Sequence, residues 1–154
     1  GLTLYTVRTS NQKLACGGTM SYPAMKEAGV DVRLGTDGSA SNNSLDLRAE
    51  AKAASLVQRH DHWDARILGP AETWDLATKG SQDWVTWDLS DIRMRPFGRD
   101  GRRLLSNLIY SGAKVLDVFV EGEAVRRDGR TLTLDEDMVA EELEESVTEY
   151  YQDV

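Results

Sequence analysis

The fold is decided by residues 22–38, which read YPAMKEAGVDVRLGTDG. The first seven predict a short helix that ends before Gly29, because glycine readily adopts the left-handed conformation that closes a helix. Residues 30–34 alternate apolar and charged side chains, which predicts a strand that ends at Gly35. Residues 2–7, LTLYTV, predict an earlier strand. A strand, a helix and a second strand in this order form the unit from which parallel sheets are built.

The next part of the chain carries two more helical patterns. Residues 45–59 are rich in alanine and predict an amphipathic helix, whose apolar stripe consists of Leu47, Ala51, Ala54 and Val57. Residues 70–79 predict a further helix, with Pro70 at its first position and Gly80 just after its end. The intervening polar segments are expected to be loops; they are residues 8–18, 39–44 and 60–69.

The pattern changes near residues 80–84. We therefore expect an α/β part over residues 1–82 and a β-rich part over residues 83–154. Within the second part, residues 104–110 predict a helix. Short β-branched or alternating runs predict strands at residues 84–89, 115–120, 123–126 and 131–134. The pairs Glu121-Gly122 and Asp128-Gly129 are typical of hairpin turns.

The last predicted element is a helix that continues through Tyr151. Thr133 and Glu136 have the spacing of a capping box, which marks where a helix begins. Its apolar side consists of Val139, Leu143, Val147 and Tyr150. This stripe predicts that the helix docks against another surface. The sequence as a whole predicts an α/β chain: a strand-helix-strand-helix unit plus a small β-rich portion that ends in a helix.

Length and composition exclude several classes of protein. The chain has 154 residues, whereas a complete (β/α)8 barrel needs about 250. No apolar run approaches 18 residues and no charged-then-apolar leader opens the chain, so we expect a cytoplasmic protein without a membrane span. Cys16 is the only cysteine, which excludes an internal disulfide. Its expected role is that of a small packed side chain rather than a thiolate nucleophile.

The charge is unevenly distributed. The net charge is -8, and nine of the 26 acidic residues lie from Asp135 onward, where there is no Lys or Arg. The remainder has 17 acidic and 18 basic residues and is therefore close to neutral. The one dense arginine cluster, between Arg93 and Arg103, is interrupted by Asp100. No nucleic-acid partner is expected from this pattern.

The most informative candidate for chemistry is Asp37, which stands between Thr36 and Gly38 at the end of the second predicted strand. Catalytic groups of α/β folds gather at the carboxyl ends of parallel strands, where the loops converge on a crevice. The neighbouring glycines allow backbone and ligand to approach closely. The alternative interpretation is a turn aspartate that accepts hydrogen bonds from the amides of its own loop.

Several ordered motifs resemble one family. TSNQKLACG at residues 9–17, MKEAGV at 25–30, LGTDG at 34–38 and SNNSLDL at 41–47 are similar to the C-terminal half of amidohydrolase-superfamily enzymes. They resemble the branch of methylthioadenosine/S-adenosylhomocysteine deaminases and triazine-type chlorohydrolases. AETWDLAT at residues 71–78 and the segments VFVEGE and RDGR at 118–123 and 127–130 extend the resemblance over nearly the whole chain.

The resemblance implies a role for Asp37. In this family the aspartate that ends the eighth barrel strand binds the metal and takes a proton from the metal-bound water. Asp37 is thus the candidate catalytic residue and metal ligand, with Zn or Fe as the implied cofactor. A divalent metal lowers the pKa of its water toward neutrality, and the hydroxide attacks an electron-poor ring carbon. The implied substrate is a small molecule that carries an N-heteroaromatic ring.

The same resemblance implies that the strand-helix-strand-helix unit is derived from part of a (β/α) barrel and begins around its seventh strand. It also implies that the family's histidine ligands lie upstream of this chain. Thr6 stands where a substrate-side histidine commonly occurs. His60 and His62 form a His-x-His pair, but we expect them in a solvated loop; as an alternative, they would bind a metal together with Asp61 or Asp64.

Two functional hypotheses follow. In the first, the chain is a truncated amidohydrolase-like protein that forms a homo-oligomer and does not catalyse by itself. Exposed strand edges require a cover, which favours self-association. In the second, it is one piece of a metal-dependent hydrolase, a deaminase or dechlorinase, active only with a complementing N-terminal chain that supplies the histidines.

Overall fold

The computed structural model of the protein describes residues 2–152, which form two compact units. The first unit comprises the chain up to Gly80 together with Ser90–Gly112, and the second comprises Ser81–Leu89 and the chain from Ala113 onward. The first unit thus includes a segment from beyond the boundary expected near residues 80–84. The domain boundary itself stays a prediction.

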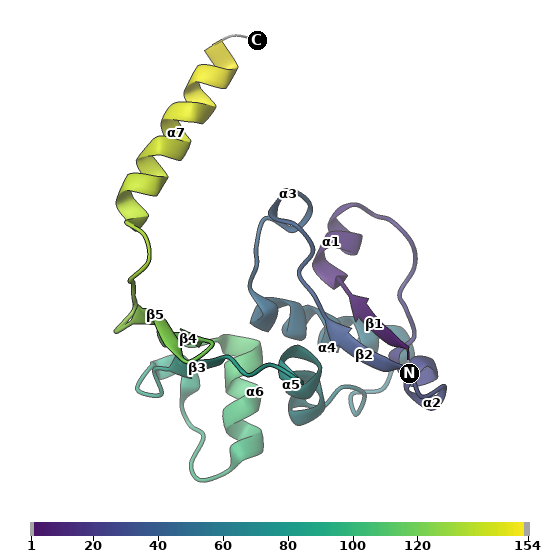
Figure 1. Ribbon diagram of the computed structural model, residues 1–154. Coiled ribbons are helices and arrows are strands. Elements are labelled where there is room, and N and C mark those ends of the chain that lie inside the picture. Colours follow the sequence, from purple (N-terminus) through teal and green to yellow (C-terminus); the bar gives the residue numbers. More distant parts are fainter. Residues whose placement is uncertain (1, 153–154) are drawn as a thin grey trace. The chain divides into compact units, whose positions relative to one another are not determined.

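The first unit holds two strands and most of the helices (Figure 1). Its elements are β1 (Thr3–Thr6), α1 (Arg8–Lys13), α2 (Tyr22–Glu27), β2 (Asp31–Leu34), α3 (Ser39–Asn42), α4 (Leu47–His62), α5 (Pro70–Thr78), a 3-10 turn (Ile92–Met94) and α6 (Gly101–Ser111). The second unit consists of β3 (Trp84–Trp87), β4 (Val115–Val120), β5 (Glu123–Arg127), β6 (Arg130–Thr131) and α7 (Glu136–Gln152).

Strands β1 and β2 pair in parallel, with Thr3 opposite Asp31 and Thr6 opposite Leu34. Helix α2 lies between them in the chain, so the predicted strand-helix-strand unit is confirmed. Alternate residues of β2 face the helices, and Val32 and Leu34 are buried there. They pack into one core with side chains from the helices and their connections, which include Tyr22, Ala51, Ala54, Leu68, Leu76 and Ile109. This core fixes the end of β2, where Asp37 follows.

Two segments predicted to be loops are short helices. Residues 8–13 form α1 and residues 39–42 form α3. Both segments are rich in Ser, Thr and Asn, which have weak helix propensity because their side chains compete for backbone hydrogen bonds. In the fold, Ser10 and Asn42 are buried and bonded to other elements. Tertiary hydrogen bonds therefore stabilise helices that local propensity does not favour.

Helix α4 is longer than predicted. It continues three residues past Arg59 to His62, and Trp63 then adopts the left-handed conformation with φ of 52°. The expectation that His60 and His62 lie in a loop is therefore wrong. Arg59 stabilises this last turn, because its guanidinium donates to the carbonyl oxygens of Ile67 and Leu68 at 2.9 Å each.

The second unit contains an antiparallel sheet in the order β3-β4-β5-β6. Both predicted hairpin turns are confirmed. Glu121 and Gly122 have φ of 51° and 86°, and Asp128 and Gly129 have φ of 49° and 78°. Two successive positive φ values characterise the turn whose twist matches that of paired strands.

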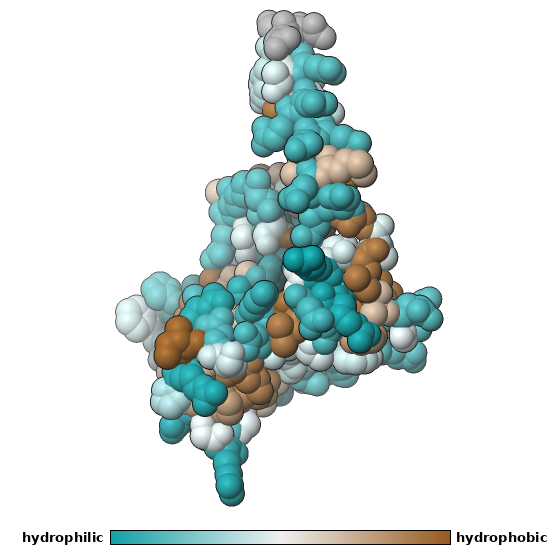
Figure 2. Space-filling view, turned by 90° about the vertical axis from the view of Figure 1, so that its left-hand side faces the viewer, coloured by the Kyte–Doolittle hydropathy of each residue, from teal (hydrophilic) through white to brown (hydrophobic). Residues whose placement is uncertain are grey.

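Helix α7 differs from its prediction in two respects. Its cap is Asp135 rather than Thr133, because the Asp135 carboxylate accepts from the amides of Asp137 and Met138 at 3.1 and 3.2 Å. Its apolar stripe is also exposed, with exposed fractions of 61% for Leu143 and 65% for Tyr150. The predicted docking is thus not found among residues 2–152. Figure 2 shows hydrophilic side chains over much of the visible face of α7. Across the part of the chain described, no helix combines the length and apolar character needed to cross a membrane.

Candidate functional site

Asp37 lies at the surface, three residues after β2 ends at Leu34. Its backbone is left-handed, with φ of 64°, a conformation that Asp tolerates better than most residues. The carboxylate accepts hydrogen bonds from the Ser10 hydroxyl at 2.7 Å and from the Gly38 amide at 2.8 Å. The Ser10 hydroxyl, followed by the Gly38 amide and the Ser41 hydroxyl, holds the pKa of Asp37 below its usual range. Asp37 is therefore an anion at neutral pH.

The Gly38 bond is the local contact that the turn interpretation predicts, but the Ser10 bond is not local. Ser10 is on α1, 27 residues earlier in the chain, and only 1% of it is exposed. A turn aspartate needs no such support from a second element. The structure thus brings together two segments that the sequence presents separately, while the role of Asp37 as catalytic residue and metal ligand stays a prediction.

A buried network of polar side chains holds the loop that contains Asp37. Asn42 donates through its side-chain amide to the Thr36 carbonyl at 2.6 Å and to the Glu50 carboxylate at 2.8 Å. The other oxygen of Glu50 accepts from the Thr9 amide at 3.2 Å. Sequence reasoning missed Ser10, Asn42 and Glu50. One signal was available: a glutamate adjoins Ala51 on the helix side that faces the core, where it requires polar partners.

The residues described do not by themselves fit a complete Zn or Fe site. A zinc site takes about four ligands, and among residues 2–152 no three His, Cys, Asp or Glu side chains are grouped to hold a metal ion. Asp37 suits one ligand position, since it is exposed and anionic. Further ligands would have to come from elsewhere.

The alternative His-x-His site is not formed. Two residues along an α-helix correspond to a rotation of about 200° around its axis, so such side chains project from nearly opposite sides. His60 and His62 both lie in the last turn of α4 and are related in this way. His62 instead lies 3.1 Å from the Ser21 hydroxyl and 3.0 Å from the Gln58 carbonyl oxygen. The His60 side chain is 83% exposed and its ring stacks near Trp63.

Cys16 is exposed, so its prediction as a packed side chain is wrong. It follows α1 in a connection that includes Ala15 and Gly17, both with positive φ. Its sulfur lies 3.9 Å from the Asn11 carbonyl oxygen. This contact is local and brings no catalytic partner toward the thiol.

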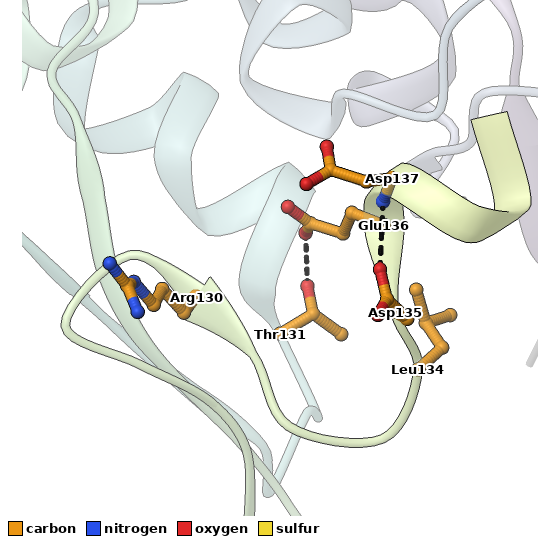
Figure 3. Close-up of a pocket in the computed structure, with 6 residues that line it drawn as sticks. All are labelled: Arg130, Thr131, Leu134, Asp135, Glu136 and Asp137. Atoms are coloured by element: carbon orange, nitrogen blue, oxygen red, sulfur yellow. Dashed lines mark hydrogen bonds between the residues drawn. The ribbon is translucent and has the colours of Figure 1, made fainter. Parts of the chain in front are cut away.

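The second unit has a separate groove of about 500 Å³ where β6 leads into α7 (Figure 3). It is lined by Arg130, Thr131, Leu134, Asp135, Glu136 and Asp137. Two of its three carboxylates already have structural roles: Asp135 caps α7, and Glu136 binds Arg126 at 2.9 Å and accepts from Thr131. The groove is thus explained by the start of the helix.

Comparison with known proteins finds a partial similarity to curated deaminases. No family model matches the chain. The chain is 34% identical over 147 residues to 5-methylthioadenosine/S-adenosylhomocysteine deaminase 1 of Archaeoglobus fulgidus. The matched region covers 84% of this chain and 34% of the relative. The chain is also 32% identical over 149 residues to 5'-deoxyadenosine deaminase of Methanocaldococcus jannaschii. This match covers 88% of this chain and 35% of the relative.

The chain is a partial homologue of the amidohydrolase superfamily. This homologue spans about a third of the length of the curated relatives that it matches.

Solved structures support the same homology. A zinc-bound adenosine deaminase from Xanthomonas campestris matches with a TM-score of 0.82 and 28% identity, over 93% of this chain and 36% of that one. The zinc complex of atrazine chlorohydrolase from Arthrobacter aurescens matches with a TM-score of 0.76 over 92% of this chain and 35% of that one. Its 20% identity shows a shared fold. The predicted α/β class, derived from part of a barrel, is confirmed.

Proposed function

We propose that this amidohydrolase homologue forms the Asp37-bearing part of the active site of a metal-dependent hydrolase that removes an amine or chloride from an N-heteroaromatic ring. We also propose that turnover requires a complementing part that carries the histidine ligands. The observation that carries the proposal is the anionic Asp37 carboxylate, held by Ser10 and Gly38 at the carboxyl end of a parallel strand. Homology to deaminases supports the class of reaction.

The contribution of Asp37 follows from its hydrogen bonds. The Ser10 and Gly38 contacts lower the pKa of this carboxyl, so the group is ionised and ready to bind a cation at neutral pH. Zn or Fe, when bound in a completed site, would lower the pKa of a water molecule. The Asp37 carboxylate would hold the ion and accept a proton at an Oδ atom, as carboxylates beside metals do in hydrolysis.

The sheet of the first unit supports the need for a complementing part. Within the part of the chain described, β1 pairs with β2 and with no other strand. Side chains on that sheet are uncovered, with 61% of Tyr5 exposed. Unpaired edges of a parallel sheet are normally covered by neighbouring strands. A histidine-bearing part would pair with these edges and bring its ligands to the ends of the strands.

A chimera tests this proposal. The homologous third of the Archaeoglobus fulgidus deaminase is replaced by this chain, and metal content and deamination of methylthioadenosine are measured. We expect about one metal ion per chimera and measurable turnover. Asp37→Asn should lower kcat/KM by about 10²–10⁴-fold, the usual contribution of a proton-transfer group. Asp64→Asn is the matched control, since Asp64 is bound by its neighbour Arg66 at the surface and should leave kcat/KM unchanged.

A chimera in which Asp37→Asn is as active as the parent would overturn the role of Asp37. The isolated 154-residue chain is tested beside it and should hold no stoichiometric metal and show no turnover. Stoichiometric metal in the isolated chain, lost in Asp37→Ala, would contradict the need for a complementing part.

The second candidate is a homo-oligomer without catalysis of its own, and the same unpaired edges of β1 and β2 favour it. In this arrangement a second copy would cover the exposed strands. Light scattering after size exclusion separates the two: a stable oligomer of the pure chain, together with an inactive chimera, supports this candidate and contradicts the first.

A further inference from the structure

Glu50 is a carboxylate buried in the core-facing side of α4. Only 1% of it is exposed, and no basic side chain among residues 2–152 forms an ion pair with it. Burying an anion without a cation is costly unless hydrogen bonds satisfy its oxygens. Both oxygens of Glu50 do accept such bonds, and both donors belong to segments that hold Asp37.

The first donor leads to Ser10. The Thr9 amide donates to one Glu50 oxygen at 3.2 Å. The next residue, Ser10, is buried and donates to the Asp37 carboxylate at 2.7 Å. The Glu50 bond thus holds the first turn of α1 where the Ser10 hydroxyl meets Asp37.

The second donor leads to the loop itself. The Asn42 side-chain amide donates to the other Glu50 oxygen at 2.8 Å and to the Thr36 carbonyl oxygen at 2.6 Å. These bonds fix both ends of the residues 36–42 that include Asp37. In addition, the Asn42 backbone amide donates to the Gly38 carbonyl oxygen at 3.0 Å.

We propose that Glu50 is a positioning residue: one carboxylate on α4 binds α1 and the loop after β2 at once, and so fixes the direction of the Asp37 carboxylate. A carboxylate suits this task because each of its oxygens accepts and neither carries a proton. A glutamine of the same shape has one acceptor and one donor. It must therefore point an N–H at either the Thr9 amide or the Asn42 amide, and one of the two connections is lost.

Amide hydrogen exchange of the full chain, measured by NMR, tests the proposal. In Glu50→Gln we expect exchange to accelerate by at least about tenfold at Thr9 and at the Ser41 and Asn42 amides, which both donate to the Gly38 carbonyl oxygen. The Gly35 amide donates to the Thr6 carbonyl oxygen at 3.0 Å, and its exchange rate should change by less than about threefold. The carboxyl carbon resonance of Asp37 should shift as well.

Gln58→Glu is the matched control. Gln58 is also 1% exposed and lies two turns further along α4, where it accepts from the Tyr22 amide and donates to the Met20 carbonyl oxygen. Replacing this amide by a carboxylate also leaves one hydrogen-bond partner mismatched, but at a position that does not contact the Asp37 loop. The contact that is lost is the donation to the Met20 carbonyl oxygen, so we expect the resonances of Met20 and its neighbours to shift and the Asp37 resonance to stay unchanged.

A second variant keeps the test decisive if Glu50→Gln does not fold. Asn42→Ala removes only the loop connection, so exchange should accelerate at Ser41 and stay unchanged at Thr9. The proposal is overturned if the loop amides of Glu50→Gln exchange as in the parent, if Gln58→Glu disturbs them equally, or if Asn42→Ala leaves Ser41 unchanged.

The functional part of this inference rests on the proposed function. In the active chimera, Glu50→Gln should weaken metal binding about 10–100-fold, the usual effect of removing a group that orients a metal ligand. Gln58→Glu should leave metal affinity unchanged, and equal losses in both variants would contradict positioning. The exchange measurements need no metal and no chimera, so an inactive chimera would reject the proposed function and leave the test of Glu50 intact.

Discussion

Helices α4 and α7 have nearly the same length, 16 and 17 residues, and both have an apolar side. Helix α4 buries the middle of that side: Ala51 is 0% and Ala54 2% exposed, whereas Leu47 at the start of the helix is 38% exposed. Helix α7 leaves its stripe in solvent, with 61% of Leu143 and 51% of Val147 exposed. An amphipathic pattern therefore indicates which side of a helix can be buried, and the rest of the fold determines whether it is.

The polar residues of the two helices explain the contrast. On α4, Glu50, Ser55 and Gln58 are buried and bind particular partners; the Ser55 hydroxyl donates to the Leu68 carbonyl oxygen at 3.0 Å, and Gln58 accepts from the Tyr22 amide at 2.9 Å. On α7 seven acidic residues occur without any Lys or Arg. Like charges three or four residues apart repel on a helix. Helix α4 is thus specified by the molecule around it, while α7 depends mainly on its own residues.

The largest expected effect compares the two helices by one substitution. Ala51→Asn places an amide in a fully buried position, whereas Ala140→Asn places it at an exposed position of α7. Both lose similar helix propensity, but only Ala51→Asn adds overpacking and an unpaired polar group. Ala51→Asn should lower the free energy of unfolding by about 2–5 kcal/mol, and Ala140→Asn by less than about 1 kcal/mol. Urea denaturation measures both, and similar losses would remove the distinction between the helices.

The caps of the two helices provide a smaller comparison. Asp46 accepts from the amides of Arg48 and Ala49 at the start of α4, and Asp135 caps α7 in the same manner. Asp46→Ala should lower the free energy of unfolding by about 1 kcal/mol, the usual cost of losing such a cap. Asp135→Ala should reduce the helical signal of α7 and leave the unfolding midpoint of the first unit unchanged. A shift of that midpoint by Asp135→Ala would show that α7 is coupled to the core.

The smallest expected effect is that of acid. It should lower the stability of the first unit and raise the helix content of α7 beyond its first turn. Hydrogen bonds from Lys79 and Arg33 lower the pKa of Asp31, and the Ser10 bond lowers that of Asp37. A carboxyl whose pKa is lower in the folded state contributes stability above its unfolded pKa and loses it as the pH falls through the folded value. The first unit should therefore lose stability in acid.

Beyond its first turn, helix α7 should instead gain helix content in acid, because protonation removes repulsion among Glu141, Glu142, Glu144 and Glu145. The first turn should lose stability, because the lowered pKa of Glu136 reflects its bonds from Thr131 and Arg126 and Asp135 caps the helix. We expect about a twofold change in the local helix equilibrium of α7 for each like-charge pair removed. Backbone NMR resonances of both regions, followed from neutral to acidic pH, measure the two trends. Parallel loss of both structures would contradict them, and 0.5 M salt should reproduce only the gain in α7.

Local patterns in the sequence determined most of the elements. The alternation at residues 30–34, the glycine after α2 and the two hairpin pairs each depend on neighbours in the chain, and the structure confirms them. The motif around Asp37 also pointed to the correct family before any geometry was known. Helices α1 and α3 could not be predicted in this way, because their Ser, Thr and Asn residues acquire partners only in the folded chain.

For the candidate site, the sequence by itself determined that Asp37 follows a parallel strand and lies beside a glycine. Only the tertiary structure decided how its carboxylate is held, because Ser10 on α1 donates to it directly and Glu50 on α4 binds Thr9 and Asn42, which belong to the segments that hold it. It also decided that His60 and His62 diverge, since they belong to a helix. Local backbone preference is encoded within a few residues, whereas hydrogen-bond partners across 8 to 41 positions exist only once the core has formed.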